Sequence, residues 1–270
     1  MSENRILRIP DLPGFELEYY YNKESIPQNP RIFPPHIHDM PEIYILTEGT
    51  SCFTVENRIY QLSAGDVVIS RPNEMHHCIL PESTVHRHLC FWFDPGFLLL
   101  EPLLTSCETS GNLISPSPQS KELLLQLYEE LSRATEEKKS RLEFALVCRI
   151  LCEIEEGIGN RQLTSPAVPA VLTEILEDIN ENFRIIDSLD YFTVRHYVSR
   201  STLGRLFRIH LHTSPRMYLE TKKMAYSRIL LRKGASVSEA CAKAGFSDVS
   251  GYIRLFRKRF GITPGEYKNR

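Results

Sequence analysis

Two copies of the tetrapeptide Arg-Leu-Phe-Arg carry side chains that can bind nucleic acid in the C-terminal part of the chain. The copies occupy residues 205–208 and 254–257, 49 positions apart, and each is followed at equal distance by a proline and a tyrosine. Arginine can donate two parallel hydrogen bonds to guanine O6 and N7 in the major groove, and it also binds phosphate. Such a repeat indicates one structural unit built twice, with a basic face suited to DNA.

Helical spacing within each copy separates side chains that face the core from side chains that face solvent. In the first copy Leu203, Leu206 and Phe207 share one helix face, whereas Arg205 and Arg208 lie on the opposite face. The second copy repeats this division. The residues predicted to face DNA are Ser201, Thr202, Arg205, Arg208, Ser250, Arg254, Arg257 and Lys258. Each copy, together with the helix predicted before it, is typical of a helix-turn-helix unit.

The charged residues are distributed unequally along the 270 residues of the chain. Residues 169–270 contain 18 Lys and Arg against 10 Asp and Glu, whereas residues 1–168 contain 14 against 24. An acidic part joined to a basic part is expected when only one of them meets nucleic acid. A single exposed arginine is usually a solvated charge, but repetition of the pattern within a basic domain favours DNA binding.

The elements that must carry these side chains are helices throughout the C-terminal part. The predicted helices cover residues 168–183, 189–197, 201–210, 215–233, 237–244 and 249–260, with a last turn from Pro264. Ser214 and Thr263 each precede a proline, which places a capping hydroxyl directly before the first helical residue. Gly234 and Gly261 are positioned to end helices, because glycine adopts the left-handed closing conformation without strain.

The N-terminal part predicts a small β-barrel over residues 30–95, following a proline-rich arm. Runs of Val, Ile, Phe and Tyr, separated by turn residues, predict strands at 42–48, 51–55, 58–62, 66–70 and 85–93. Strands this short and closely spaced are typical of a barrel or a sandwich.

Two amphipathic helices follow the barrel over residues 119–157. Their apolar residues exceed one narrow stripe, so the helices have enough apolar surface both to cover the barrel and to contact a second subunit. We expect a homodimer through helices 119–156, with Leu127 and Leu146 contributing to the subunit contact. The predicted domains are therefore residues 1–160 for effector sensing and dimerisation, 161–169 as linker, and 170–270 for DNA binding.

Residues 185–270 resemble the paired helix-turn-helix domain of the AraC/XylS transcription regulators. The matching motifs are Ser199-x3-Leu203-x3-Phe207, Pro215-x2-Tyr218-Leu219, Ala242-x2-Gly245-Phe246-Ser247-Asp248 and Phe256-x4-Gly261-x2-Pro264-x2-Tyr267. The resemblance implies that one monomer inserts both reading helices into successive major-groove segments, joined by the long helix 215–233. It assigns the base-facing positions to Ser201, Gly204, Arg205, Ser250, Gly251, Ile253 and Arg254.

Several positions depart from the pattern of that family. His212 stands where glycine is usual after the first reading helix, and histidine tolerates the left-handed conformation better than most residues. Lys223 and Ser227 stand in the central helix where Arg and Ala are common. Gly251 and Ile253 leave the second reading helix with few hydrogen-bonding groups. We therefore expect the first unit to carry more of the base reading and the second mainly to anchor phosphate.

A histidine-rich pattern in the acidic part resembles the two sequence motifs of the cupin barrel. The pattern is His36-x-His38-x3-Glu42-x6-Gly49, followed by Gly65-Asp66 and Pro72-x3-His76. In cupins the corresponding histidines and glutamate can converge on one metal ion, and this donor set suits Fe, Mn, Ni, Cu or Zn. In AraC-type sensor barrels such side chains instead line an effector pocket or hydrogen-bond within it. The candidate pocket residues are His36, His38, Glu42, Tyr44 and His76, and the candidate metal ligands are His36, His38, Glu42 and His76.

The cysteines and the N-terminus restrict the environment of the protein. Seven scattered cysteines without a Cys-x-x-Cys pair predict reduced thiols rather than a disulfide framework or a structural zinc site. Residues 1–5 lack the order of a signal peptide, and apolar stretches such as residues 97–100 are far too short to span a membrane. We expect a cytoplasmic protein without a membrane partner.

These expectations combine into one function and two alternatives. The fold class is multidomain α+β, with a cupin-like barrel, two following helices and an all-α domain of two helix-turn-helix units. The expected function is a sequence-specific transcription regulator, not an enzyme, that binds double-stranded promoter DNA under control of a small effector such as a sugar. RNA polymerase is a further candidate partner, and no cofactor is expected apart from a divalent metal at the histidine cluster. The alternatives are a cupin metalloenzyme or metal sensor with a DNA-binding domain, and an architectural DNA binder without an effector.

Overall fold

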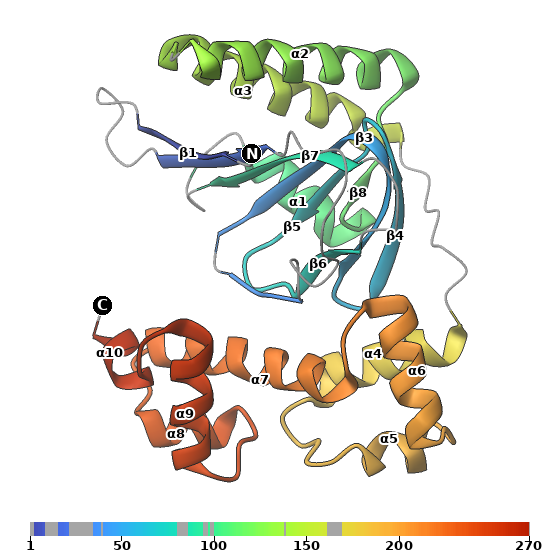
Figure 1. The fold of residues 1–270 in the computed structure, drawn as a ribbon, viewed down its shortest axis with the longest axis vertical. Coiled ribbons are helices and arrows are strands. Elements are labelled where there is room, and N and C mark those ends of the chain that lie inside the picture. Colours follow the sequence, from blue (N-terminus) through green and yellow to red (C-terminus); the bar gives the residue numbers. More distant parts are fainter. Residues whose placement is uncertain are drawn as a thin grey trace. The chain divides into compact units, whose positions relative to one another are not determined.

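The structure, a computed structural model, describes residues 3–8, 16–21, 35–38, 40–79, 86–93, 97, 100–137, 139–160 and 169–269. Only the backbone is described in residues 3–8, 16–21, 108–110, 135–136 and 159–160. The chain forms two compact units. The first unit contains residues 1–33 and 38–166, and the second contains residues 34–37 and 167–270. In Figure 1 the strands and the green helices belong to the first unit, and the orange to red helices belong to the second. The predicted linker, residues 161–169, lies outside the described residues except for Pro169.

The first unit is built on one antiparallel sheet that curves into a half-barrel (Figure 1). Its strands are β1 (Glu3–Arg8), β2 (Glu16–Tyr21), β3 (Glu42–Val55), β4 (Arg58–Ser63), β5 (Val67–Ser70), β6 (His76–Ile79), β7 (His86–Phe93) and β8 (Leu113–Ile114). The strand order is β1-β2-β7-β3-β5-β8, and β4 and β6 also pair with β3. The predicted cupin-like barrel followed by helices is confirmed at the level of this half-barrel.

The central strand β3 corrects the prediction of two separate strands at 42–48 and 51–55. It runs without interruption through 14 residues, and its pairing with β7 shifts register between Leu46 and Glu48. Gly49 has φ of 91°, a conformation that glycine adopts easily, so the strand can bend at this point. The first half of β3 therefore pairs with β5 and β7, and the second half pairs with β4 and β6.

Three helices cover one face of the sheet. They are α1 (Glu101–Ser110), α2 (Pro118–Glu136) and α3 (Ser140–Glu156), followed by the short 3-10 helix η3 (Gly157–Asn160). The helices share an apolar cluster with Ile43 and Ile45 of β3, whereas Tyr44 and Leu46 belong to a second cluster inside the half-barrel. This alternation follows from the two-residue period of a strand. The sequence did not predict helix α1 or strands β1, β2, β6 and β8.

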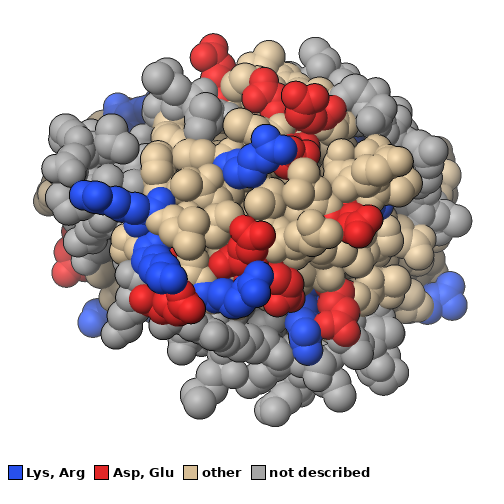
Figure 2. All heavy atoms as spheres, turned by 90° about the horizontal axis from the view of Figure 1, so that it is seen from above, with Lys and Arg blue, Asp and Glu red and all other residues tan. Residues whose placement is uncertain are grey.

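Leu127 and Leu146 are not exposed, contrary to their predicted role in a subunit contact. Each side chain is only 7 % exposed and packs in the cluster between the helices and the sheet. Leucine at these positions stabilises the unit itself, so its replacement by a charged residue would unfold the unit rather than separate subunits. The outward side of α2 and α3 carries Lys, Arg, Asp and Glu interspersed with uncharged residues (Figure 2).

The second unit is helical, as predicted. Its helices are α4 (Ala170–Asn182), α5 (Asp190–Arg195), α6 (Arg200–Leu211), α7 (Pro215–Arg232), α8 (Val237–Lys243), α9 (Val249–Phe260) and α10 (Pro264–Lys268). Ser214 and Thr263 cap α7 and α10 by accepting backbone hydrogen bonds, which confirms both predicted caps. His212 closes α6 in the left-handed conformation with φ of 47°, and Gly261 closes α9 with φ of 75°. Helices α5 and α6 form one helix-turn-helix pair, and α8 and α9 form the other (Figure 1).

Candidate functional site

The first predicted reading helix, α6, is fixed by a cap and exposes a basic face. The Ser199 side chain accepts a hydrogen bond from the Thr202 backbone N–H at 3.0 Å, and the two hydroxyl oxygens lie 2.9 Å apart. Leu203, Leu206 and Phe207 are buried, whereas Ser201, Arg205 and Arg208 are exposed. The predicted division of faces is therefore present. Thr202 is half-buried, and its place beside the cap gives it a structural contact that the sequence did not indicate.

The second predicted reading helix, α9, has an acidic cap. The Asp248 carboxylate accepts hydrogen bonds from the Ser250 N–H at 3.0 Å and the Gly251 N–H at 2.8 Å. Tyr252 and Phe256 are buried. The exposed residues on the other side are Ser250, Arg254, Arg257 and Lys258. The helix thus presents three cations and little else that can hydrogen-bond to a base.

The cap of α9 supplies a physical reason for Gly251. A Cβ atom at this position would lie 2.6 Å from Asp248 Oδ2, so any larger residue would displace the capping carboxylate. Arg254 Nη2 lies 3.9 Å from the same carboxylate oxygen. The Asp248 carboxylate therefore lies within reach of one of the side chains predicted to read DNA.

The exposed cations of the reading helices differ in their ion pairs. Arg200, at the first turn of α6, binds Asp190 of α5 through two hydrogen bonds of 2.7 and 2.5 Å. Among the described residues, no ion pair involves Arg205, Arg208 or Arg257. Arg200 thus joins the two helices of the first helix-turn-helix pair, while these three arginines remain available for phosphate or base edges.

A buried carboxylate that sequence reasoning missed holds the first helix-turn-helix pair against α4. Asp178 of α4 is 5 % exposed and accepts hydrogen bonds from Asn182 Nδ2 at 2.7 Å, Tyr191 Oη at 3.0 Å and His196 Nε2 at 2.8 Å. Arg195 Nε lies 3.0 Å away. Burial alone would raise the pKa of Asp178, but these donors outweigh it and hold the pKa below its usual value. An acidic residue within an apolar helix stripe was the available signal in the sequence.

One end of the half-barrel interior gathers three of the predicted site residues around a single oxygen atom. Glu42 Oε2 lies 3.1 Å from His38 Nε2 and 3.5 Å from His76 Nε2. Trp92 Nε1 donates a hydrogen bond of 2.7 Å to the same oxygen. Glu42 and His76 are buried, and the two imidazole rings meet edge to face with centroids 4.7 Å apart.

The other ring nitrogens of these histidines fix their protonation. His38 Nδ1 lies 2.7 Å from the Met40 carbonyl oxygen, and His76 Nδ1 lies 2.9 Å from the Glu74 carbonyl oxygen. A carbonyl only accepts, so each Nδ1 carries the proton. In a neutral imidazole Nε2 then has a lone pair, and that lone pair faces the carboxylate. A cation held between Nε2 of His38, Nε2 of His76 and the Glu42 carboxylate would satisfy both lone pairs, and a protonated His76 would instead donate to the carboxylate.

Opposite charges in this cluster stabilise each other. Burial would raise the pKa of Glu42, but the charge of His76 and hydrogen bonds from His38 and His76 hold the pKa well below its usual value. For His76, burial lowers the pKa, yet the neighbouring Glu42 carboxylate raises it overall. Glu42 is therefore an anion inside the half-barrel and favours positive charge beside it.

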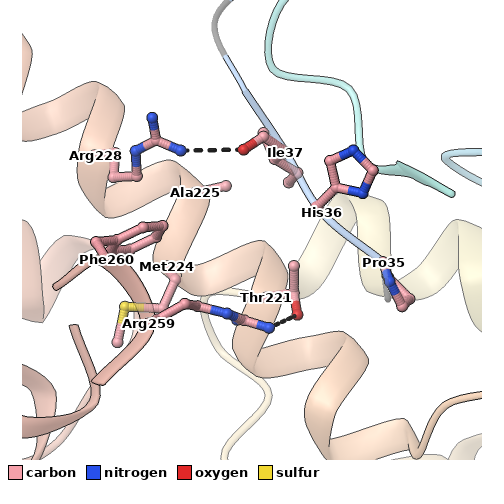
Figure 3. A pocket seen from close by; sticks show the side chains of 9 residues that line it. All are labelled: Pro35, His36, Ile37, Thr221, Met224, Ala225, Arg228, Arg259 and Phe260. Atoms are coloured by element: carbon pink, nitrogen blue, oxygen red, sulfur yellow. Dashed lines mark hydrogen bonds between the residues drawn. The ribbon is translucent and has the colours of Figure 1, made fainter. Parts of the chain in front are cut away.

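The fourth candidate ligand, His36, precedes His38 by two residues in the chain. His36 belongs to the second unit, whereas His38, Glu42 and His76 belong to the first. His36 also lines a cavity of about 250 Å³ formed by the segment 35–37 and helices α7 and α9. In that cavity Arg228 Nη1 donates to the Ile37 carbonyl oxygen at 3.0 Å (Figure 3).

Tyr44, the fifth candidate pocket residue, belongs to a different polar group inside the half-barrel. Its hydroxyl lies 3.0 Å from His86 Nε2 and 3.4 Å from Cys78 Sγ. His86 Nε2 also lies 3.1 Å from His88 Nδ1. Burial lowers the pKa of His86 to about 4 and, together with the charge of His86, lowers that of His88 to about 3. This second group is therefore neutral, in contrast to the charged group around Glu42.

The two units together define a class of protein. A half-barrel with an inward-facing polar cluster, joined to a basic domain of two helix-turn-helix units, is the architecture of a ligand-responsive transcription regulator. The sequence profile of the AraC-like ligand binding domain matches residues 26–147, and that of a helix-turn-helix domain matches residues 194–270. The chain belongs to the AraC family of transcription regulators.

The chain is similar to individual proteins and to solved structures. The transcriptional activator RhaR of Mannheimia succiniciproducens is 22% identical over 248 residues, which cover 88% of both chains. The transcriptional activator RhaS of Enterobacter sp. (strain 638) is 24% identical over 252 residues, covering 87% of both chains. A crystal structure of an apo ToxT variant from Vibrio cholerae gives a TM-score of 0.38 and 13% identity, covering 95% of this chain and 97% of that one. The curated relatives are named as activators of transcription and not as enzymes. Among the described residues, no helix has both the length and the apolar character of a membrane span.

Proposed function

We propose that the protein binds promoter DNA through α6 and α9 and that a small polar molecule, such as a sugar, controls it from the half-barrel. The observation that carries the proposal is the repeated arrangement of a capped helix with an aromatic core face and an exposed arginine face. Because Arg205 and Arg254 occupy equivalent positions, they are the first candidates for contact with bases. Such a regulator acts on DNA and belongs in the cytoplasm, where RNA polymerase is a further partner.

The DNA contact is tested by replacing Arg205 and Arg254 separately with alanine. Each replacement is expected to weaken operator binding by about 1–3 kcal/mol, which is roughly 5- to 150-fold, and to relax base preference near the lost contact. Arg205→Ala is expected to cost more, because Gly251 and Ile253 leave α9 poor in hydrogen-bonding groups. Binding is measured by gel shift at moderate salt on duplexes selected from random DNA by the full chain. Arg133→Ala on α2, which removes an exposed charge from the first unit, is the control.

Equal binding of both arginine variants and the wild type would contradict this assignment. If the wild type selects no preferred sequence at all and its affinity depends only on salt, the architectural alternative is correct.

The control by a small molecule is proposed from the polar groups inside the half-barrel. Glu42 and His76 offer charged partners, and Tyr44 with His86 offers neutral ones, so a ligand with several hydroxyls can satisfy both groups. Ligands are screened by the thermal unfolding of the full chain, followed through the fluorescence of Trp92, the single tryptophan. A ligand present at 100 times its Kd stabilises the folded unit by about 2.7 kcal/mol. Glu42→Gln and Tyr44→Phe are expected to abolish the response, and a response kept by both would place the ligand elsewhere.

A second candidate function, metal sensing, is supported by the histidine protonation described above. Metal-bound histidines characteristically donate their other ring N–H to a carbonyl or carboxylate, as His38 and His76 do. Two imidazoles and a carboxylate suit Zn, Fe, Mn, Ni or Cu ions. His36 is the candidate for a fourth ligand. A metal held there would be the effector itself or would anchor an oxygen-bearing effector.

Metal binding is measured by titrating the chelator-treated full chain with Co²⁺ and Zn²⁺, using visible absorbance and elemental analysis after desalting. We expect one metal ion per chain in the wild type and none in His38→Gln or His76→Gln. His77→Gln is the matched control, because His77 is equally buried but bonds Thr54 Oγ1 at 2.6 Å. No retained metal in the wild type, or retention by all four proteins, would leave the cluster as an ion pair or an effector contact.

A further inference from the structure

Lys223 lies at the centre of the connecting helix α7 and contacts both helix-turn-helix units. Its side chain is only 6 % exposed. The Nζ atom donates one hydrogen bond to the Ile186 carbonyl oxygen and another to the Gly245 carbonyl oxygen, both at 2.7 Å. Ile186 lies just before α5 of the first helix-turn-helix unit, and Gly245 lies in the turn between α8 and α9 of the second. One ammonium group therefore joins segments that are 59 residues apart in the sequence.

The burial of this ammonium group is energetically demanding. Burial lowers the pKa of Lys223, although the nearby carboxylates of Asp187 and Glu220 act in the opposite direction. Two short charge-assisted hydrogen bonds offset the loss of hydration. An apolar side chain would fill the same space without that loss, but it would leave two buried carbonyl groups without these donors. The lysine is thus well suited to hold two backbone segments at a fixed separation.

Other contacts hold the same junction, which consists of α7, the segment before α5 and the turn before α9. Gly245 has φ of +82°, and a Cβ atom there would lie 2.1 Å from the Arg184 carbonyl oxygen, so the turn before α9 packs directly on the segment before α5. Two residues earlier on α7, the Thr221 hydroxyl accepts a hydrogen bond of 2.7 Å from Arg259 Nη2 of α9 (Figure 3). Helix α7 therefore contacts the start of the first helix-turn-helix unit through Lys223 and the reading helix of the second through Thr221.

We propose that Lys223 is a positioning residue that sets the separation and angle of α6 and α9, and thereby the spacing of the two DNA segments that one chain reads. The inference rests on the proposed DNA contacts of these two helices. Two rigidly joined reading helices can bind two DNA segments at once only when the distance between the segments matches the distance between the helices. Loss of the Lys223 contacts is expected to weaken DNA binding at that spacing. It is also expected to reduce the affinity lost when the spacing between the two DNA segments is changed.

The test uses the full chain and a duplex selected from random DNA by the wild type. Hydroxyl-radical footprints of wild type, Arg205→Ala and Arg254→Ala identify the segment that each helix contacts. A second duplex then carries one additional base pair between the two segments. Binding to both duplexes is measured for wild type, Lys223→Met, Lys223→Gln and Lys223→Arg. Lys233→Met is the control, because it removes an exposed lysine at the end of the same helix.

For the wild type and Lys233→Met, the added base pair is expected to reduce affinity at least 10-fold. For Lys223→Met and Lys223→Gln, affinity for the original duplex falls about 10-fold, while the added base pair costs less than 3-fold. Lys223→Arg, which keeps a charged donor, restores part of the spacing dependence.

The Lys223 inference is overturned if a folded Lys223→Met or Lys223→Gln variant keeps the full spacing penalty, or if it loses affinity equally for every duplex. Circular dichroism establishes which variants are folded, and Lys223→Gln provides the comparison should Lys223→Met unfold. If the wild type selects no duplex, the proposed DNA contacts fail. If it selects one and the Lys223 variants keep its spacing, only the role of Lys223 fails.

Discussion

Whether a histidine inside the half-barrel is charged depends on the groups that surround it. Glu42 and His76 lie in a charged group, while His86 and His88, on the next strand, are neutral because burial depresses their pKa values. The sequence placed histidines at all these positions but could not separate the two groups. Which imidazole is charged depends on the distance to a carboxylate, and only the folded strands determine that distance.

The neutral pair His86 and His88 predicts a loss of stability in acid. In the unfolded chain both histidines titrate near pH 6.5, whereas in the folded chain they titrate at about 4 and about 3. Below pH 6.5 the unfolded state therefore binds more protons, so the free energy of unfolding falls as the pH drops toward 4. Each histidine contributes up to about 1.4 kcal/mol per pH unit. Above pH 6.5 this contribution is fully present.

Urea unfolding followed by Trp92 fluorescence measures this dependence, because the only tryptophan of the chain lies in the same half-barrel. The double variant His86→Asn, His88→Gln is expected to show a flatter pH profile between 6.5 and 4. An unchanged slope would mean that the acid sensitivity has another source.

In the second unit the residue types predicted the exposure and conformation of individual residues better than they did in the half-barrel. The exposure of Arg205 and Arg254, and the left-handed His212, follow from helical spacing and from the position of the helix end. The reason for Gly251 did not follow, because it depends on the side chain of Asp248 in space. In the sequence Lys223 differs from other residues only as a departure from the family pattern, because its two carbonyl partners are distant along the chain.

Among the elements, helices with a clear period were predicted well and short strands were not. The helices of the second unit agree with the sequence to within a few residues, since apolar spacing and caps such as Ser236 and Thr263 mark them locally. Strand β6 begins with His76 and His77 and has no alternation, because both of its faces are buried. Strands β1 and β2 flank a proline-rich stretch that resembled an arm.

The turn before α9 offers a matched pair of glycine substitutions. Gly245 and Gly234 both have left-handed φ angles, 82° and 90°, but only Gly245 packs against another backbone segment. Gly234→Ala is expected to lose about 1–2 kcal/mol from the conformation alone. Gly245→Ala adds a clash with the Arg184 carbonyl and is expected to lose about 3 kcal/mol or more.

Thermal unfolding of the helical signal by circular dichroism compares the two glycine variants, and the DNA spacing assay shows whether a folded Gly245→Ala loosens the junction. Equal destabilisation by the two variants would contradict the close approach of the two segments.

At the scale of the whole molecule, the unequal charges and the two repeated sequence patterns sufficed to predict a sensor joined to a DNA-binding domain. Periodicity alone did not show which apolar residues of α2 and α3 stay exposed, because the two helices bury more apolar residues against their own sheet than one stripe requires. The outward face of α3 instead carries Leu142, which is 45 % exposed, together with the exposed Ala145 and Cys152.

We propose that the face formed by Leu142, Ala145 and Cys152 joins two copies of the chain. The double variant Leu142→Glu, Ala145→Glu is expected to sediment as a monomer in analytical ultracentrifugation while keeping the wild-type melting temperature. Gln126→Glu, at an exposed position of α2, is the control. A dimer that survives the double variant but not Gln126→Glu would place the contact on α2.

The continuity of β3 has a consequence for hydrogen exchange. Its backbone pairs with β4, β5, β6 and β7, so its amides form hydrogen bonds to more strands than those of any other strand described in the sheet. Exchange at such a strand requires opening of the whole unit, whereas the ends of helices exchange through local fraying. Amides of β3 are therefore expected to be the slowest of the first unit, and a ligand bound near Glu42 would slow them in proportion to its binding free energy. Deuterium uptake along this one strand would then report occupancy of the half-barrel without any knowledge of the operator.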